Sequence, residues 1–519
     1  MNLNIIKKTY DVNVSQDVLR ILKSESLFYL RGCNILEYLT CDIELLEQRS
    51  AIFNDTFKIK GLKSVIEQAA ECLDHISEMI KLQCNIDERE RSLYSIKQFQ
   101  LYFEVVDLLS NFYKNNKGYF TSIDYINFFE NTVVLSADRE YVLLKKKSEK
   151  LVQKISNVKS VTVAFNLDES LSPQDAGIIS VNNYRISSAS LVERILGGDE
   201  KFSLAPIVPP RRLCTESEYN VLNFSLYMSL KKIFTKALKQ WEPEVCKYLQ
   251  KHMDGLLNCL NDLKFILNIV NIIERMTKAG LKLSKPIYYP MTKKKFAAAG
   301  LYNPVLAINY AENTPGKQIV KNDISFDNEA GIYVMTGANS GGKSVFLCAV
   351  ALTQIMAQIG MLVPADKLEI SPVSSLFVVL PKNDLLNQDG RLAEECKAIQ
   401  TIFRGINEYS ILFFDELFSS TDPIESVILS SEVLKAMSVA RIRGIYSTHF
   451  HALIEEAKKI NCNNVANIKI DFLVADIING EKRTYKIRRQ KPDGQSYALS
   501  IANQYGICCE KLLGELNSV

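Results

Sequence analysis

The chain has 519 residues, of which 47% are hydrophobic and 23% are charged, so it is long enough for two to four globular domains. Its formal net charge of +3 is too small to indicate a nucleic-acid-binding protein by itself. Polar residues occur throughout positions 1–20, which argues against a signal peptide, and no apolar run approaches about 18 residues, which argues against a membrane span. The twelve cysteines include no C-x-x-C pair and do not suggest a disulfide framework. These features predict a cytoplasmic protein.

The N-terminal part of the chain has the pattern of packed helices. Residues 18–117 contain no proline, and their apolar residues recur three and four positions apart. This spacing predicts amphipathic helices over 69–82 and 93–112, with the aromatic residues of the second helix in a core. We therefore expect a helical core domain over residues 1–135.

A basic helix and a small β excursion are expected next, over residues 136–215. The predicted helix 136–157 carries five lysines, namely Lys145, Lys146, Lys147, Lys150 and Lys154. They fit DNA phosphates and a solvated helix face equally well. Segments 158–167 and 176–181 alternate like strands and are expected to pair, and three prolines within 204–213 indicate a linker.

Long helices and then an α/β region complete the chain. Helical spacing over 219–238 and 245–276 predicts lever-like helices, which we assign to residues 216–290. Beyond about residue 300, short apolar runs alternate with helices, which is typical of a mostly parallel sheet. We expect a multidomain α plus α/β protein whose last domain covers residues 291–519.

A phosphate-binding loop opens this last domain. Residues 336–344 read T-G-A-N-S-G-G-K-S between a strand-like run and a helix-like run. The glycines let successive N–H groups point at phosphates, the lysine attracts the β- and γ-phosphates, and the final serine binds Mg²⁺. The expected nucleotide-binding residues are Gly337, Ala338, Asn339, Ser340, Gly341, Gly342, Lys343 and Ser344, with ATP or GTP as the nucleotide and Mg²⁺ as the metal.

Polar residues follow two further strand-like runs. The run 411–414 ends in Asp415 and Glu416, and the run 442–446 leads to His449. Because parallel strands present their carboxyl ends at one sheet edge, these side chains should meet the loop. We expect Asp415 to hold Mg²⁺ together with Ser344, Glu416 to activate the attacking water, and His449 to sense the γ-phosphate.

These motifs together resemble the ATPase domain of the MutS mismatch-repair family, which is an ABC-type P-loop domain. The similar segments are 337–344, 415–416, 447–450, 303–306, 321–323, 359–365, 408–410 and the end of the domain from 494. The resemblance covers roughly residues 302–507. It implies ATP as the nucleotide, a place for Asn322 in its site, and a homodimer in which each site is completed by the partner's signature segment.

The chain departs from the family pattern at several positions. Gly390 and Arg391 occupy the places of the serine–threonine pair in the family's S-T-F-x-x-E motif, while Glu395 matches its glutamate. The hydroxyl that would contact the partner's γ-phosphate is therefore missing, and we expect the positive charge of Arg391 to replace it. Ile319 occupies the place of the aromatic residue that stacks on adenine. We find no F-x-E wedge before the helical core, so we expect no mismatch reading of that kind, and residues 136–215 correspond to a reduced clamp.

Two functions remain open at this stage. The first is a Mg²⁺-dependent MutS-like ATPase whose dimer closes around double-stranded or structured DNA in repair or recombination. The alternative is an ATPase whose nucleotide state controls dimerisation or a protein partner without DNA. The resemblance and the lysines of 145–154 favour the first, while the missing wedge and the small net charge favour the second.

Overall fold

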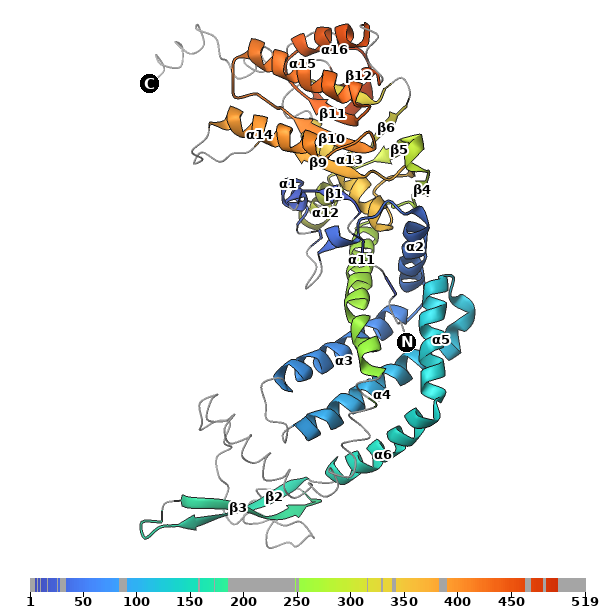
Figure 1. Cartoon of the computed structure of the whole chain (residues 1–519), viewed down its shortest axis with the longest axis vertical. Coiled ribbons are helices and arrows are strands. Elements are labelled where there is room, and N and C mark those ends of the chain that lie inside the picture. The colour runs from blue at the N-terminus through green and yellow to red at the C-terminus, as the bar shows by residue number, and fades with distance from the viewer. Residues whose placement is uncertain are drawn as a thin grey trace. The chain divides into compact units, whose positions relative to one another are not determined.

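The computed structural model describes residues 5–492 with gaps (Figure 1). The gaps are 7, 10, 16, 26, 29–33, 84–90, 157–158, 172, 185–247, 249–251, 315, 328–329, 338–341, 382–389, 463–467 and 479–481. The predicted features that lie partly or wholly outside the described residues include the linker, the helix 219–238, the first part of the helix 245–276, the middle of the phosphate loop and the segment from 494.

The chain divides into two compact units that differ from the four predicted domains. Unit 1 holds Met1–Asn4, Ser64–Gly118 and Ile126–Leu260, and unit 2 holds Ile5–Lys63, Tyr119–Tyr125 and Asn261–Val519. The predicted core domain 1–135 is thus split, because residues 5–63 group with the C-terminal region. Two contacts show why: the strand β1 joins the C-terminal sheet, and the Asp262 carboxylate accepts the backbone N–H groups of Ile5 and Ile6.

Unit 1 is built from helices around an aromatic core. Its elements include most of α3 (Leu62–Gln83) and α5 (Ile123–Ala137), with α4 (Arg91–Asn116), α6 (Arg139–Ser156) and the antiparallel hairpin β2 (Ser160–Leu167) and β3 (Pro173–Asn182). The rings of Phe99, Tyr102, Phe103, Tyr141 and Tyr248 are buried against one another. Both predicted helices and the predicted strand pair are confirmed, and Phe99, Tyr102, Phe103 and Tyr113 of α4 form core.

The predicted helix 136–157 differs at its beginning. α5 ends at Ala137, and α6 starts at Arg139. Asp138 lies between them, and its carboxylate accepts the backbone N–H of Tyr141, as an N-terminal capping residue does. The cap therefore starts a new helix where the apolar spacing alone predicts a continuous one.

Unit 2 begins with short N-terminal elements and the helix α11. These are β1 (Asn13–Val14), α1 (Val18–Ile21), η1 (Ile35–Tyr38), α2 (Ile43–Lys58), η3 (Lys117–Tyr119) at the unit boundary, and α11 (Leu260–Lys278). Among the residues described, one helix, His252–Lys278, passes a length-and-composition test for a membrane span. Its apolar window is 67% buried inside the protein, as in a core helix, so this is weak evidence for a span.

A seven-stranded sheet carries the predicted α/β region. Its order is β1-β9-β10-β11-β7-β12-β13, with every neighbour parallel except the last pair. The remaining strands are β7 (Ile332–Thr336), β9 (Ser375–Val379), β10 (Ser410–Asp415), β11 (Arg443–Ser447), β12 (Ile470–Ile478) and β13 (Lys482–Arg489). The three runs predicted from sequence are β7, β10 and β11, and they are parallel neighbours as expected.

A second sheet of four strands lies in the same unit. Its order is β4-β8-β5-β6, and its elements are β4 (Ile287–Tyr288), β5 (Phe296–Leu301), β6 (Asn322–Phe326) and β8 (Lys367–Ile370). The 3-10 turn η4 (Met291–Lys293) and the helix α12 (Pro304–Asn313) connect its strands. β6 lies against β13, so the two sheets meet beside the loop that follows β7.

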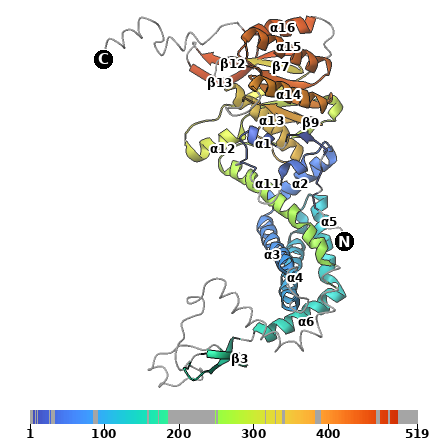
Figure 2. The same ribbon diagram turned by 60° about the vertical axis from the view of Figure 1, so that its left-hand side comes forward.

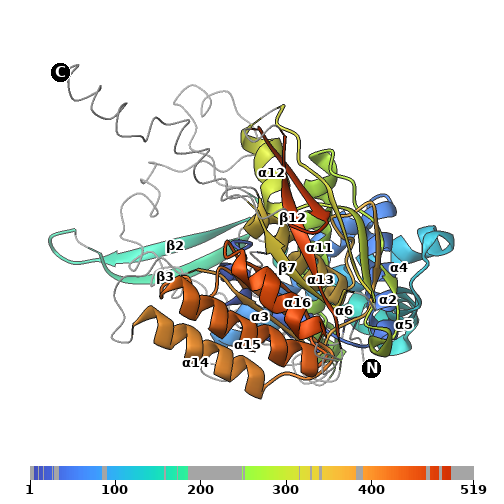
Figure 3. The same cartoon turned by 90° about the horizontal axis from the view of Figure 1, so that it is seen from above.

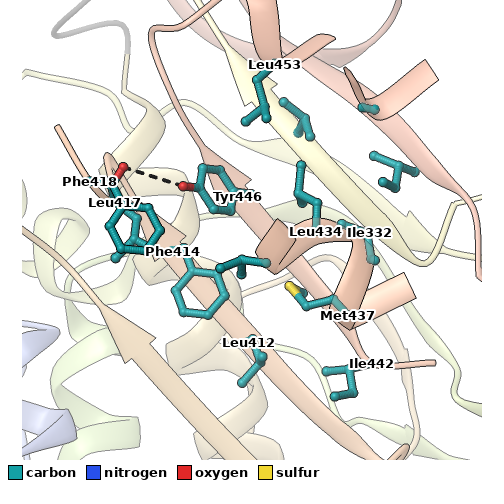
Figure 4. Packing of buried hydrophobic residues seen from close by; sticks show 14 of the residues in the cluster. Ile332, Leu412, Phe414, Leu417, Phe418, Leu434, Met437, Ile442, Tyr446 and Leu453 are labelled. Atoms are coloured by element: carbon teal, nitrogen blue, oxygen red, sulfur yellow. Dashed lines mark hydrogen bonds between the residues drawn. The ribbon is translucent and has the colours of Figure 1, made fainter. Parts of the chain in front are cut away.

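Helices cover both faces of the seven-stranded sheet. α14 (Arg391–Arg404), α15 (Pro423–Val439) and α16 (Ala452–Cys462) lie side by side on one face (Figures 2 and 3). Beneath them, alternate strand residues such as Val334, Leu412 and Tyr446 form one apolar cluster with Leu434 and Met437 of α15 (Figure 4). α13 (Lys343–Ile359) packs on β10 and β11 and contributes nothing to this cluster, so it covers the other face.

Candidate functional site

The phosphate loop begins and ends on glycines in left-handed conformations. Gly337 has φ +125° and Gly342 has φ +92°, values that other residues rarely adopt. A Cβ atom on Gly337 would also lie 2.8 Å from the Cβ of Ala475. Ala338, Asn339, Ser340 and Gly341 lie outside the described residues. Gly342 caps α13 without a side-chain hydrogen bond, so the N-terminal N–H groups of this helix are available to an anion.

Lys343 is a buried cation at the start of α13. Its residue is 5% exposed, and its Nζ donates to the carbonyl oxygen of Gly337 at 2.7 Å. Burial lowers the pKa of the Lys343 ammonium, while the nearby carboxylates of Glu416 and Asp415 raise it. A buried ammonium is stabilised by an anionic ligand, and the phosphates of a nucleotide supply that charge.

Asp415 and Ser447 lie opposite each other at the ends of β10 and β11. Both are buried, and the Oδ1 of Asp415 and the Oγ of Ser447 have no hydrogen-bond partner within the described part of the chain. Buried polar atoms normally have partners, so an ion or an ordered water fits here.

The donor set also fits Mg²⁺ rather than a metal held entirely by protein. No cluster of three or more His, Cys, Asp or Glu side chains that could hold a metal occurs among the residues described. Mg²⁺ is usually bound by one or two protein groups plus phosphates and water. The buried Asp415 and the exposed Ser344, which lines the cavity beside the phosphate loop, are protein groups of this kind.

Glu416 stands directly after β10 in a left-handed conformation, with φ +50°. Its backbone N–H donates to the carbonyl oxygen of Ser447 at 2.9 Å, which fixes the residue to the end of β11. The Nδ1 of His449 lies 3.9 Å from its Oε1, too far for a direct hydrogen bond and suited to a bridging water. The structure thus brings both predicted catalytic residues to the same sheet edge.

A cavity of about 550 Å³ opens beside the phosphate loop. Its lining includes the predicted residues Ile319, Asn322, Gly342, Lys343, Ser344 and Glu416. Asp415 and His449 do not border this cavity. The position and size of the cavity suit a nucleotide whose phosphates reach Lys343.

Four aromatic residues line this cavity and were not predicted, and two of them, Tyr302 and Phe346, are buried. Tyr310 and Tyr485 both line it, and Tyr485 is presented by β13 with φ +59°. Asn322 holds β13 in place, because its Nδ2 donates to the Tyr485 carbonyl at 3.2 Å and its Oδ1 accepts the Ile487 N–H at 2.8 Å. The only sequence signal for Tyr485 is an aromatic residue within a basic strand, and Ile319 therefore need not be the side chain that meets the base.

The predicted signature residues lie at the start of α14. Gly390 is the N-cap, the Nε of Arg391 lies 3.1 Å from the Oε1 of Glu395, and the Nη2 of Arg391 lies 3.4 Å from the Oγ of Ser419. The Oε2 of Glu395 accepts the backbone N–H of Phe418 at 2.8 Å. Arg391 and Glu395 therefore contact the loop that follows Glu416 in their own chain.

The predicted DNA-contacting lysines lie on α6, in unit 1. Lys145 forms an ion pair with Asp107 of α4, so it joins two helices of the same unit. Lys146 and Lys147 are exposed. The side chains of Lys150 and Lys154 lie outside the described residues.

Comparison with known proteins finds similarity over the C-terminal part of the chain. Residues 333–513 match MutS domain V. Over this segment the chain is similar to the MutS family. It is 30% identical over 201 residues to a protein of Streptococcus pneumoniae, and 30% identical over 206 residues to a protein of Bacillus velezensis, both named Endonuclease MutS2. These alignments cover 38% and 39% of this chain and 25% of each relative, so they span about a quarter of the relatives' length.

The MutS domain V match contains most of the site. It starts within β7 and includes the phosphate loop, Asp415, Glu416, His449 and Tyr485. Asn322 and Tyr310 precede it and complete the cavity from the four-stranded sheet and α12. The family resemblance read from the sequence is thus confirmed, in a chain of mixed helix and sheet with its MutS domain V near the C-terminus.

Proposed function

We propose that this protein is a member of the MutS family that binds and hydrolyses ATP with Mg²⁺. In this proposal its ATP state controls a homodimer that acts on DNA in repair or recombination in the cytoplasm. The observation that supports the ATPase part is that the buried Lys343 and Glu416 line the same cavity. Asp415 precedes Glu416, and its Oδ1 has no hydrogen-bond partner among the described residues. A buried cation, an activating carboxylate and an available metal ligand are the groups that phosphoryl transfer to water requires.

Each residue has a distinct task in this proposal. The N–H groups at the start of α13 and the Lys343 ammonium bind the β- and γ-phosphates, and Tyr485 and Tyr310 offer ring faces to the base. Glu416 orients a water and accepts its proton, and His449 lies close enough to share that water. Mg²⁺ held by Ser344 and Asp415 would neutralise charge on the phosphates.

The DNA part of the proposal depends on family membership and on the exposed Lys146 and Lys147. The alternative is a nucleotide-gated protein-interaction ATPase, and one observation favours it: Lys145, the first lysine of the basic cluster, is paired with Asp107. The relatives carry the name endonuclease, but the match to them supports domain V and adds no support for nuclease activity.

The test is ATP hydrolysis by the purified protein, alone and with duplex, mismatched and branched DNA, at low and moderate salt. We expect hydrolysis that depends on Mg²⁺ and is stimulated by one of the DNA forms, less strongly at moderate salt. Hydrolysis that is indifferent to every DNA would favour the protein-interaction alternative. No hydrolysis above that of Lys343→Ala would refute the ATPase proposal.

A further inference from the structure

The loop that carries Glu416 is held in an unusual backbone conformation. Glu416 has φ +50° and Phe418 has φ +60°, so two non-glycine residues within three positions are left-handed. Such conformations persist only where the surroundings fix them. The side chains of Leu417 and Phe418 are buried beside Phe414 and Tyr446, which anchors the loop to the core (Figure 4).

Hydrogen bonds fix the backbone of this loop on both sides of Phe418. The Ser426 hydroxyl donates to the Phe418 carbonyl oxygen at 2.5 Å, and the Oε2 of Glu395 accepts the Phe418 N–H at 2.8 Å. Ser426 belongs to α15, which follows the loop directly, whereas Glu395 belongs to α14 and lies 23 positions before Phe418. The Glu395 carboxylate therefore links the loop by a hydrogen bond to a helix that is not adjacent to it in the sequence.

The Glu395 carboxylate is itself held in position. Its side chain is 13% exposed, and its Oε1 is paired with the Arg391 Nε one helical turn earlier. The Arg391 Nη2 also reaches Ser419, the residue after Phe418. The first turn of α14 thus meets the loop at two adjacent residues through one ion pair.

We propose that Glu395 is a positioning residue for Glu416 of the same chain, oriented by Arg391. This inference rests on the proposed ATPase function and assigns the two signature-segment residues a task within their own site. The carboxylate of Glu395 accepts the Phe418 N–H, and this hydrogen bond keeps the Glu416 carboxylate in the position where it contacts the attacking water. Without that acceptor, the left-handed loop relaxes and the Glu416 carboxylate moves away from the γ-phosphate. Small displacements of a reacting group cost up to about a hundredfold in rate.

The test compares Glu395→Ala with Glu395→Gln. The alanine removes the acceptor, while the glutamine keeps an oxygen for the Phe418 N–H and loses the ion pair with Arg391. We expect Glu395→Ala to lower kcat about ten- to a hundredfold with unchanged affinity for ATP, and Glu395→Gln to recover most of that loss. Gln400→Ala, on the exposed side of the same helix, is the matched control and should behave as wild type.

A double variant separates positioning from general damage. Glu395→Ala combined with Glu416→Gln should be no slower than Glu416→Gln alone, because Glu395 acts only through Glu416. Three results would overturn the inference and leave the ATPase proposal intact. They are additive losses of kcat in the double variant, an equal fall of kcat and ATP affinity in Glu395→Ala, and a kcat of Glu395→Ala equal to that of wild type. A wild-type protein without hydrolysis above Lys343→Ala would overturn the proposed function itself, and the inference with it.

Discussion

At the scale of single residues, Lys343 combines burial with positive charge. We predict that Lys343→Ala lowers the affinity for ATP at least about a hundredfold, because the phosphates lose their charged partner. The same change should alter the free energy of unfolding by no more than about 1 kcal/mol, because burial disfavours the charged form in the absence of a ligand. Calorimetric titration with ATP and denaturant unfolding check both parts, with Lys367→Ala as an exposed control. A large loss of stability would show that the ammonium is structural.

The lowered pKa of Lys343 also predicts a pH dependence. Its pKa lies below the ordinary 10.5 in the folded protein, so the unfolded chain binds the proton more tightly. Between the lowered pKa and 10.5, the contribution of Lys343 to stability therefore rises with pH, and it is smallest below that window. The affinity for ATP should fall as pH rises through the lowered pKa, because a neutral amine attracts phosphate less. Titrations across alkaline pH measure this, and Lys343→Ala should show no such fall.

Glu416 is the residue whose loss should separate binding from turnover. Glu416→Gln keeps the shape of the side chain and removes the base, so we predict about a hundredfold to ten-thousandfold slower hydrolysis with retained ATP binding. Single-turnover hydrolysis and nucleotide binding measured on the same preparation check this. Undiminished hydrolysis would mean that another group orients the water, such as His449, whose Nδ1 lies 3.9 Å from the Oε1 of Glu416.

At the scale of elements, β13 is placed over the cavity by Asn322. We predict that Tyr485→Ala weakens ATP binding about tenfold, as loss of a base–aromatic stack does, and that Tyr485→Phe is nearly neutral. Asn322→Ala should weaken binding by a similar factor, because β13 loses two hydrogen bonds. The double variant should then be no weaker than Tyr485→Ala. If the two losses multiply instead, Asn322 contacts the nucleotide directly.

Elements with a strong local signal were predictable, and tertiary partners were not. β7, β10 and β11 are short buried runs that end in polar residues, so sequence alone places their ends at one edge. β1 has two residues and pairs with a strand more than 300 positions away, which leaves no periodicity to read. The hydrogen bond from the Phe418 N–H to Glu395 could not be predicted from the sequence either, because it depends on where α14 packs.

At the scale of the whole molecule, contact with DNA can be tested on α6. If α6 meets phosphates, Lys146→Glu combined with Lys147→Glu should weaken DNA binding and reduce the slope of log affinity against log salt by about two. Lys145→Glu is a contrasting variant, because it breaks the ion pair with Asp107 and should mainly destabilise unit 1. Unchanged binding and slope in the double variant would remove α6 from any DNA interface.

In an assembly of two chains, mixing experiments show which chain each residue serves. Lys343→Ala has no working phosphate loop, and Glu395→Ala has a displaced Glu416 in its own site. If Glu395 acts within its own chain, every site of a mixed dimer retains a defect, and mixing should not raise activity above the average of the two variants. If Glu395 instead serves the partner, half of the dimers gain one intact site of two, and about a quarter of wild-type activity returns. We predict no recovery, measured as ATP hydrolysis after the two variants are unfolded and refolded together.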